Sequence, residues 1–408
     1  MGKIYLFFTW YINGIGGLQL YINHKTDFLH KEGWTIYVVS GDDYPDLLMD
    51  NCFDKIICEP SILFPEYYFF PNQRKKVIAH ILNLVPKDFM ECVIESHGPQ
   101  IATWAESVAQ MLSAKHIVFN SDERPICPTP LKSFFLFKLK RRELAGITYD
   151  CSKFFIEQFS SSMPYNPELI AWGANECVQD VNYDLSKLTN GLFTIGLLGR
   201  LSKSYMKDTV KEICKFVCDN KEKVNIIYIG GEPNKYTPIR HRLEREYKNL
   251  DNINLIFTGT LYPVPRMLVH RFDVCIAGAG SSIAMTKEGI PTICVDPRDC
   301  KATGVLGITT MTTIYSIGKK TDKQPISQVL KDIKANPNKY KPPKFDILYE
   351  FEEHLKFLSN SNKERDYNIS FLERYNVLFF LYKLVFYIFK PMRIIKAKSV
   401  VKVLLRGK

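Results

Sequence analysis

The chain lacks the cysteine patterns that mark disulfide-rich proteins and many metal-binding ones. Its eleven cysteines are scattered among 408 residues, with no Cys-x-x-Cys pair and no paired Cys/His spacing. Thiols distributed in this way favour a protein of a reducing compartment, in which the cysteines stay unpaired.

Targeting signals and long apolar runs are also missing. The N-terminal run "MGKIYLFFTW" leads directly into a glycine turn without a small-residue cleavage site, and the Met-Gly start lacks the Ser or Thr of a myristoylation signal. In the apolar C-terminal segment the longest uncharged stretch is Tyr375–Tyr382. This stretch is far shorter than the roughly 20 residues that cross a bilayer. We therefore expect a cytoplasmic protein.

The folded part of the chain has no strong excess of basic charge. The formal net charge is +11, but eight positive charges and no acid lie between Tyr375 and the C-terminus. The remainder is close to neutral and contains no recognisable nucleic-acid-reading module, so we expect no nucleic-acid partner.

The tail, residues 366–408, is instead apolar, aromatic and basic. It can form an interfacial helix on the anionic inner face of the cell membrane, where each basic residue contributes about 1 kcal/mol. It can also form a C-terminal helix that packs on the domains, and both alternatives stay open. The segment "LKSFFLFKLKRREL" (131–144) has the same character. Two such segments favour a peripheral membrane protein.

What the chain does contain is a regular alternation of strands and helices. Its length predicts two domains, and 46% hydrophobic with 24% charged residues is an ordinary globular balance. Short apolar runs indicate buried parallel strands, and the amphipathic stretches between them indicate helices. We predict strands within 3–10, 34–41, 55–58, 90–98 and 115–121, and helices within 17–33 and 101–114.

A second series follows the polar, turn-rich segment 181–191, which we interpret as a linker. Its strands are predicted within 193–201, 224–233, 253–261, 273–280 and 292–297, and its helices within 208–220, 236–250 and 282–289. The predicted fold class is α/β, with two Rossmann-like doubly wound domains facing a central cleft. The expected domains are 1–180 on the acceptor side and 192–365 on the nucleotide-sugar side, followed by the helical tail.

Glycines stand at two predicted strand-to-helix turns. Gly14, Gly16 and Gly17 follow the first strand, and such a turn lets the backbone approach a phosphate at the N-terminus of a helix. A tight turn without a ligand would have the same sequence. The spacing is not that of the dinucleotide fingerprint, because the third glycine comes too early.

The second domain adds basic side chains and another such turn. Arg200 follows a strand-ending glycine, with Lys203 and Lys207 close behind. A diphosphate leaving group needs cations of this kind, although one of the lysines can simply form a surface salt bridge. The second turn offers N–H groups and hydroxyls to a phosphate or ribose, and its alternative role is a plain helix cap. Its candidate residues are Gly278, Gly280, Ser281 and Ser282.

Taken together, the motifs resemble the GT-B-fold glycosyltransferases, and most closely the large retaining family that uses nucleotide-diphosphate sugars in bacterial surface polysaccharide synthesis. The resemblance spans most of residues 1–320. It is carried by the order and spacing of six motifs: "GIGG" (14–17), "ESHGP" (95–99), "LGRLSKSYMK" (198–207), "IIYIGGEP" (226–233), "LIFTGTL" (255–261) and "GAGSS…EGIPTICVD" (278–296).

The resemblance implies a role for several positions. Gly16 and Gly17 would face the donor diphosphate, Arg200 and Lys207 would grip it, and His97 would lie near the reacting sugar. Further donor contacts would come from Gly230 and from the nucleobase pocket formed by Thr258, Gly259, Thr260 and Leu261. The donor would be a nucleotide-diphosphate sugar, with no cofactor and no catalytic metal.

One family feature is absent. The paired glutamates seven residues apart are missing, and Ala284 stands where the second of them would hold the ribose. Glu288 is the candidate replacement, although it directly precedes Gly289 and can simply face water. The resemblance therefore leaves the nucleotide and the stereochemistry open, and it favours a retaining reaction.

His97 ends a predicted strand, where it can bind a sugar hydroxyl or move a proton, and Glu95 is the alternative. We expect a glycosyltransferase that transfers a sugar to a glycan, in particular a lipid-linked glycan. The alternatives are a nucleotide-sugar epimerase or hydrolase of the same fold, and a non-catalytic scaffold subunit.

Overall fold

The structure is a computed structural model that describes residues 2–14, 16–42, 51–122, 125–169, 177–178, 182–231, 239–296, 298–311, 323–344, 351–361 and 377–388. The chain forms two compact units. The first unit comprises residues 1–171 and 349–408, and the second comprises residues 172–348.

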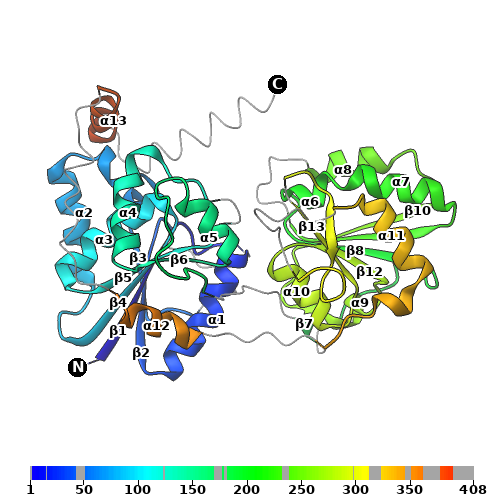
Figure 1. The fold of residues 1–408 in the computed structure, drawn as a ribbon, viewed down its shortest axis with the longest axis horizontal. Helices are drawn as coiled ribbons and strands as arrows, with labels where there is room; N and C mark the ends of the chain where they lie inside the picture. Colours follow the sequence, from blue (N-terminus) through cyan, green and yellow to red (C-terminus); the bar gives the residue numbers. More distant parts are fainter. Residues whose placement is uncertain are drawn as a thin grey trace. The chain divides into compact units, whose positions relative to one another are not determined.

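The first unit is built on a six-stranded parallel sheet with the strand order β3-β2-β1-β4-β5-β6 (Figure 1). Its strands are β1 (Gly2–Thr9), β2 (Trp34–Ser40), β3 (Lys55–Cys58), β4 (Phe89–His97), β5 (Lys115–Asn120) and β6 (Leu144–Gly146). The strands are nearly continuous apolar runs because both faces of the sheet are covered. The five strands expected from the sequence are confirmed.

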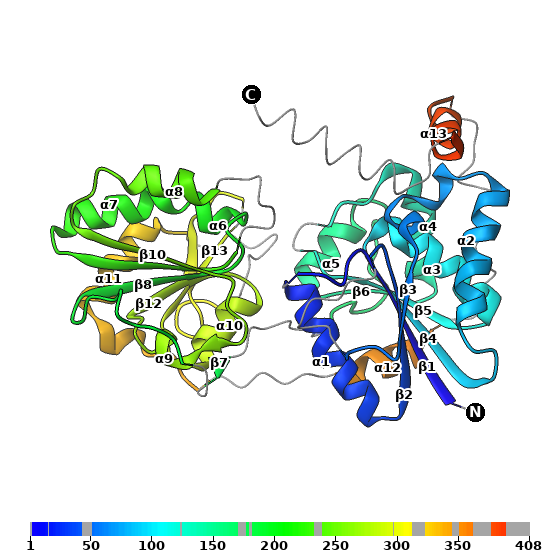
Figure 2. The same ribbon diagram turned by 180° about the vertical axis from the view of Figure 1, so that it is seen from behind.

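Helices cover both faces of this sheet. They are α1 (Gly17–Lys31), α2 (Pro71–Leu84), α3 (Pro99–Leu112), α4 (Lys132–Lys140) and α5 (Tyr149–Ile156), with short turns η2 (Pro60–Leu63), η3 (Glu66–Tyr68) and η4 (Thr129–Leu131). Helices α2 and α3 pack with one face of β1, β2 and β4 in a single apolar cluster that includes Ile81, Trp104 and Ile94. Helix α1 lies on the other face (Figure 2).

The segment after the second unit returns to the first. Helix α12 (Phe351–Ser359) lies beside α1 and β5, with the Phe351 ring 5.8 Å from Phe28 and the His354 ring 5.4 Å from Phe119. The expected domain boundary at residue 365 is therefore wrong for residues 351–361. Their apolar and imidazole side chains complete the core of the first unit.

The second unit has the strand order β10-β9-β8-β12-β13-β14, in which only the edge strand β14 is antiparallel. Its strands are β8 (Phe193–Leu198), β9 (Val224–Ile229), β10 (Ile253–Gly259), β12 (Val274–Ala277), β13 (Thr292–Val295) and β14 (Ala302–Val305). A separate parallel pair joins β7 (Cys177–Val178) to β11 (Val264–Pro265).

Helices also cover both faces of the second sheet. They are α6 (Ser204–Lys207), α7 (Val210–Asn220), α8 (Ile239–Tyr247), α9 (Arg266–Val269), α10 (Gly280–Lys287) and α11 (Ile326–Ala335), followed by η5 (Pro337–Tyr340). Helices α6, α7, α8 and α11 share one apolar cluster with the sheet, whereas α9 and α10 share another. This is the doubly wound arrangement expected from the sequence.

The predicted linker is part of the second unit. Tyr183, Leu185 and Leu188 pack against the apolar cluster of α9 and α10, and Asn225 Nδ2 donates to the Thr189 carbonyl (2.9 Å). Residues 182–191 are irregular, as predicted, but their apolar side chains hold them on the sheet, so the expectation of a free linker is wrong.

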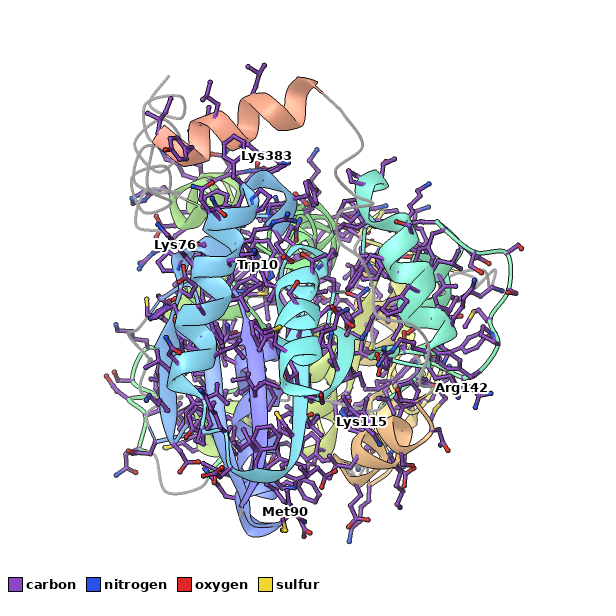
Figure 3. All side chains as sticks on the ribbon, turned by 90° about the vertical axis from the view of Figure 1, so that its left-hand side faces the viewer. Trp10, Lys76, Met90, Lys115, Arg142 and Lys383 are labelled. Atoms are coloured by element: carbon purple, nitrogen blue, oxygen red, sulfur yellow. The ribbon has the colours of Figure 1, made fainter. Side chains whose placement is uncertain are left out.

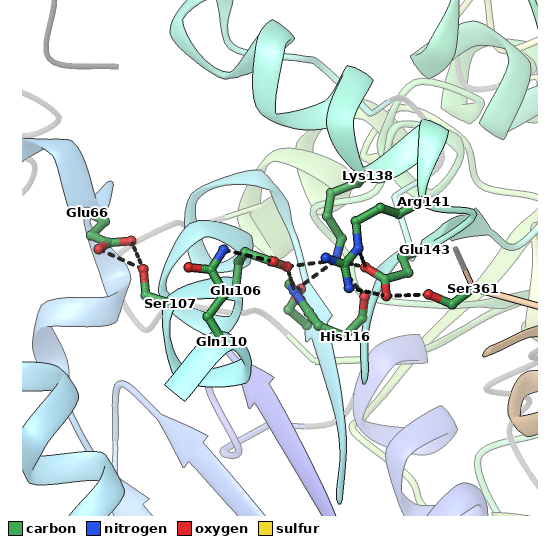
Figure 4. A network of polar contacts seen from close by, with 10 residues as sticks. Glu66, Glu106, Ser107, Gln110, His116, Lys138, Arg141, Glu143 and Ser361 are labelled. Atoms are coloured by element: carbon green, nitrogen blue, oxygen red, sulfur yellow. Dashed lines mark hydrogen bonds and ion pairs between the residues drawn. The ribbon is translucent and has the colours of Figure 1, made fainter. Parts of the chain in front are cut away.

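Helix α4 is not the surface patch that its sequence suggested. Phe134 and Phe135 are fully buried, and Lys138 lies in a buried network with Glu106, His116 and Glu143 (Figure 4). Lys138 Nζ donates to Glu106 Oε2 and to the His116 carbonyl, both at 2.7 Å. Ser361 Oγ, from the returning segment, donates to Glu143 Oε1 (2.6 Å).

Helix α13 (Val377–Ile388) belongs to the predicted tail and lies against η3, with the Tyr387 and Phe70 rings 5.9 Å apart. Figure 3 shows it beyond the end of α2, with Lys383 labelled. The other tail residues, 366–376 and 389–408, lie outside the described residues. In the described part of the chain, no helix is both long enough and apolar enough to cross a membrane.

Candidate functional site

Each sheet has a point at which its strand order reverses. In the first unit this point lies between β1 and β4, and in the second between β8 and β12. Ligands of doubly wound sheets bind beyond the carboxyl ends of the strands at such a point. Of the sequence candidates, His97 ends β4, Arg200 follows β8, and the turn 278–280 follows β12.

The early glycines form the strand-to-helix turn expected from the sequence. Gly14 has a φ of +82°, Gly16 is the N-cap of α1, and Gly17 begins the helix. The loop is anchored from β2, because Asp42 Oδ1 accepts hydrogen bonds from the Ile12 N–H (3.0 Å) and from Ser40 Oγ (2.8 Å). That Gly16 and Gly17 bind a diphosphate stays a prediction.

His97 is at the strand end, but its side chain is buried rather than open, with 1% exposed. Its Nε2 lies 2.8 Å from Glu95 Oε1, and its carbonyl accepts a hydrogen bond from Trp10 Nε1 (3.0 Å). The next residue, Gly98, has a φ of +102°, and a Cβ there would lie 2.6 Å from Trp10 Nε1. Packing at this turn therefore accounts for the glycine of the "HG" pair.

Glu95 is the centre of a buried polar cluster on the α1 face of the sheet. Its carboxylate accepts hydrogen bonds from Tyr5 Oη (2.5 Å) and Tyr21 Oη (2.6 Å) and is ion-paired with Lys25. Burial alone would raise the pKa of Glu95, but Lys25 and His97 together hold it well below its ordinary value. Glu95 is therefore an anion buried beside His97.

In the second unit, the ends of three strands are joined through glycines. The Gly199 N–H donates to the Ile229 carbonyl (3.0 Å), and the Gly230 N–H donates to the Gly259 carbonyl (2.9 Å). A Cβ at Gly230 would lie 1.8 Å from the Gly199 carbonyl oxygen. Close backbone packing therefore requires Gly230 whether or not a donor binds there.

Arg200 and Lys207 lie on the loop and short helix that follow β8. Arg200 is exposed, and no described carboxylate forms an ion pair with it or with the half-buried Lys207. Both cations are therefore available to a ligand, and the salt-bridge alternative for Lys207 finds no partner among the described residues.

Tyr205, which the sequence did not single out, joins the two predicted donor elements. It is buried, and its Oη donates to the Leu198 carbonyl (3.2 Å). A Cβ at Gly199 would lie 2.3 Å from Tyr205 Oη, and one at Gly278 would lie 3.3 Å from its ring. The ring is thus packed between the Arg200 loop and the second glycine turn, so the fold brings these two candidates together.

The second glycine turn has a strained backbone. Ala279, the N-cap of α10, has a φ of +52° and a ψ of −135°, a conformation that non-glycine residues rarely adopt. Of the described residues, none accepts a hydrogen bond from the backbone N–H of Gly280 or Ser281. These two donors and the positive end of the helix suit an anion.

Two of the proposed donor residues, Ser282 and Glu288, already have partners within the protein. Ser282 is buried and its hydroxyl donates to the Ala279 carbonyl (2.7 Å), so it caps the turn. Ala284 packs in the apolar cluster behind α10. Glu288 is held by Arg266, whose Nε and Nη2 donate to the two carboxylate oxygens at 2.7 and 3.0 Å. This pairing conflicts with the expectation that Glu288 simply faces water, while its contact with a ribose stays a prediction.

The predicted nucleobase segment ends β10. Thr258 Oγ1 donates to the Gly259 carbonyl (2.9 Å), Gly259 has a φ of +75°, Thr260 is exposed and Leu261 is half-buried. Gly231 packs on this segment, because a Cβ there would lie 2.1 Å from Thr260 Oγ1. The segment lies at the same edge as Arg200, while its contact with a base stays a prediction.

Among the described residues, no three His, Cys, Asp or Glu side chains form a group that could hold a metal ion. Catalysis without a metal or cofactor stays a prediction.

Comparison with known proteins gives matches in structure. No family model and no curated protein matches the chain. Anabaena HepE, solved with UDP and glucose, matches with a TM-score of 0.58 at 10% identity, over 88% of this chain and 99% of HepE. A glycosyltransferase from Rickettsia africae matches with a TM-score of 0.58 at 11% identity, over 94% and 98%.

These matches extend over both units. The chain has the GT-B fold. S. aureus MnaA, solved with UDP, also matches, with a TM-score of 0.51 at 13% identity, over 90% of this chain and 100% of MnaA. The sequence-based prediction of the fold is thereby confirmed. At these identities the likeness establishes the fold alone.

Proposed function

We propose that this protein is a glycosyltransferase that moves a sugar from a nucleotide-diphosphate donor to a glycan acceptor. The observation that carries the proposal is the arrangement of hydrogen-bond donors and positive charges at the carboxyl edge of the second sheet. There, two cations and two helix N–H groups that have no partner among the described residues lie on elements that Tyr205 packs together, at the reversal point of a GT-B fold. The solved complexes of HepE and MnaA with UDP support a nucleotide donor.

The chemistry follows from the leaving group. As the bond between sugar and diphosphate breaks, negative charge develops on the diphosphate, and cations fixed at that position stabilise the transition state more than the bound substrate. Arg200 can donate two parallel hydrogen bonds to phosphate oxygens, whereas Lys207 acts as a point charge. The N–H groups of Gly280 and Ser281 can hold a second phosphate oxygen.

The test is binding and turnover of Arg200→Ala. We expect UDP or GDP to bind the wild-type protein in calorimetry, and the variant to lose about 3 kcal/mol of transition-state stabilisation, roughly 100- to 1,000-fold in kcat/KM. Lys211→Ala is the matched control, because Lys211 is an exposed lysine on α7. The melting temperature of Arg200→Ala should be unchanged.

Three outcomes would contradict this proposal. Wild-type turnover in Arg200→Ala would show that Arg200 does not stabilise the leaving group. Failure of both nucleotides to bind would favour a non-catalytic scaffold. Conversion or hydrolysis of a nucleotide sugar without transfer to any acceptor would favour an epimerase or hydrolase. A separate thermal-shift screen of intact nucleotide sugars would identify the donor.

The acceptor side of the proposal is a lipid-linked glycan at the anionic inner surface of the cell membrane, used in cell-surface polysaccharide synthesis. Support comes from α13, where Leu381, Leu384, Val385 and Ile388 follow the i, i+3, i+4, i+7 spacing of one helix face and are 41–60% exposed. An apolar stripe on a helix that begins a basic tail suits an interfacial location. Retention of the sugar's configuration also stays part of the proposal.

A further inference from the structure

One ring nitrogen of His97, Nδ1, is not used by the contacts described so far. His97 Nδ1 is buried and has no hydrogen-bond partner among the described residues, whereas Nε2 is 2.8 Å from Glu95 Oε1. A buried acceptor or donor without a partner destabilises the folded protein, because it has lost its hydrogen bonds to water. The cost is recovered only when a ligand or water supplies the missing group.

The carboxylate decides which nitrogen of His97 carries the proton. Glu95 is ionised, so it can only accept, and Nε2 must therefore be the protonated nitrogen that donates to it. In the neutral imidazole, Nδ1 then has a free lone pair and can only accept. The ring is held in place, because it stacks on Phe7 with centroids 6.0 Å apart, and the rings of Tyr21 and Phe119 pack edge-on against it.

Groups from four elements keep the carboxylate charged and in place. Glu95 stands on β4, Tyr5 comes from β1, and Tyr21 and Lys25 come from α1, while His354 comes from α12. His354 Nδ1 lies 3.0 Å from Lys25 Nζ and 3.3 Å from Tyr21 Oη. The positive charge of Lys25 balances the negative charge of Glu95.

We propose that Glu95 is the positioning residue of His97, and that it presents Nδ1 as a fixed hydrogen-bond acceptor for a hydroxyl group of a substrate sugar that binds on the first unit. This inference rests on the proposed function, because it assigns a substrate group to Nδ1. Lys25 holds Glu95 in its ionised form, and His354 extends the same chain of contacts to the returning helix. Glu95 thus acts through His97 and not on the substrate, which differs from the expectation that it could replace His97.

The orientation can be read directly from the wild-type protein. In full-length protein labelled with ¹⁵N-histidine, the His97 signals are identified by their loss in His97→Gln. We expect the ring proton on Nε2, which is the nitrogen that faces the ionised Glu95. A ring protonated on Nδ1 alone, or on both nitrogens, would overturn the inference even if Glu95→Gln failed to fold.

Kinetics test the consequence. Glu95→Gln keeps the shape but can donate to Nε2, so the proton should move to Nδ1 and the acceptor should be lost. We expect kcat to fall roughly 10- to 100-fold, as for carboxylates that orient metal-binding histidines, with the donor KM unchanged. Wild-type kcat in a folded Glu95→Gln would overturn the inference.

The milder variant Tyr21→Phe removes one hydrogen bond to Glu95 and keeps its charge. It should retain the wild-type tautomer and most of the activity, and a loss equal to that of Glu95→Gln would indicate a merely structural cluster. Failure of nucleotide binding in the wild-type protein, by contrast, would refute the proposed function, whatever the tautomer of His97.

Discussion

Gly230 illustrates how a residue that resembles a ligand contact can be required by packing. Its Cα lies so close to the Gly199 carbonyl that no side chain fits, and its φ of +155° disfavours other residues. Gly231 differs, because a Cβ there would clash only with the side chain of the exposed Thr260, 2.1 Å from its Oγ1. The sequence predicts Gly230 as a donor contact, whereas the structure shows that backbone packing at the sheet edge already requires a glycine there, so the donor contact stays a prediction.

We predict that Gly230→Ala destabilises the second unit by about 2–4 kcal/mol, because backbone and not a flexible side chain would have to move. Urea unfolding measures the loss. Gly2→Ala is the matched control, since a Cβ at Gly2 meets nothing within 4 Å. Equal stability of the two variants would show that the strand ends can separate without cost.

His116 makes the stability of the first unit depend on pH. Burial and the neighbouring Lys138 lower the pKa of His116 to about 4, and the neutral ring is held between Glu106 Oε2 and Ser96 Oγ, both at 2.8 Å. Below its ordinary pKa of about 6.5 the unfolded chain binds a proton that the folded chain rejects. Stability is therefore lost as the pH falls from about 6.5 to 4.

We predict that His116→Gln removes this dependence, which amounts to about 3 kcal/mol in the wild-type protein. The measurement is the free energy of unfolding at pH 7 and pH 4.5 for both proteins. Glu106 and Glu143 affect the stability only at lower pH. Burial raises their pKa values, but the positive charge of Lys138 and the hydrogen bonds to the two carboxylates together have the larger effect and lower them. The same pH dependence in both proteins between pH 7 and 4.5 would contradict the assignment to His116.

At the scale of elements, helix α12 is the clearest departure from the sequence order. It follows the second unit in the chain, yet Phe351 is buried against Phe28 and Tyr21 of α1. Nothing in its short amphipathic pattern distinguishes a helix that ends the second domain from one that completes the first. Its partners lie more than 300 residues away, as the contact of His354 with Lys25 shows.

We predict that Phe351→Ala, which removes a buried ring at a cost of about 3–5 kcal/mol, weakens the first unit and not the second. Hydrogen exchange should show lower protection in β4 and α1. Ile333→Ala in α11 is the matched control, because Ile333 is buried in the second unit and should affect β8 and β9 instead. Lower protection in β8 after Phe351→Ala would instead support the predicted domain boundary at residue 365.

At the scale of the whole molecule, we propose that two features bind the membrane: the exposed apolar face of α13 and the positive charges of the tail. We predict that full-length protein floats with anionic vesicles and that neutral vesicles or high salt weaken the interaction. Leu381→Ser with Leu384→Ser removes about 2 kcal/mol of apolar contact, a roughly 30-fold loss of binding.

The matched control for this experiment is Met90→Ser, which removes another exposed apolar side chain, far along the chain from α13. If the double variant and the control float equally well, α13 does not contact the membrane, and the lipid-linked acceptor loses its support.

The local pattern of the sequence was enough for the strands, several helices, both glycine turns and the two-domain fold. Short apolar runs, helical spacing and backbone freedom at glycine are properties of neighbouring residues, so they can be predicted from the order of residues in the chain. Only the tertiary structure decided that Glu288 pairs with Arg266, that Tyr205 lies between two turns, that Lys138 is buried and that α12 returns to the first unit. These outcomes depend on which charges and apolar faces meet across long sequence separations, where each buried ion must find its counter-ion.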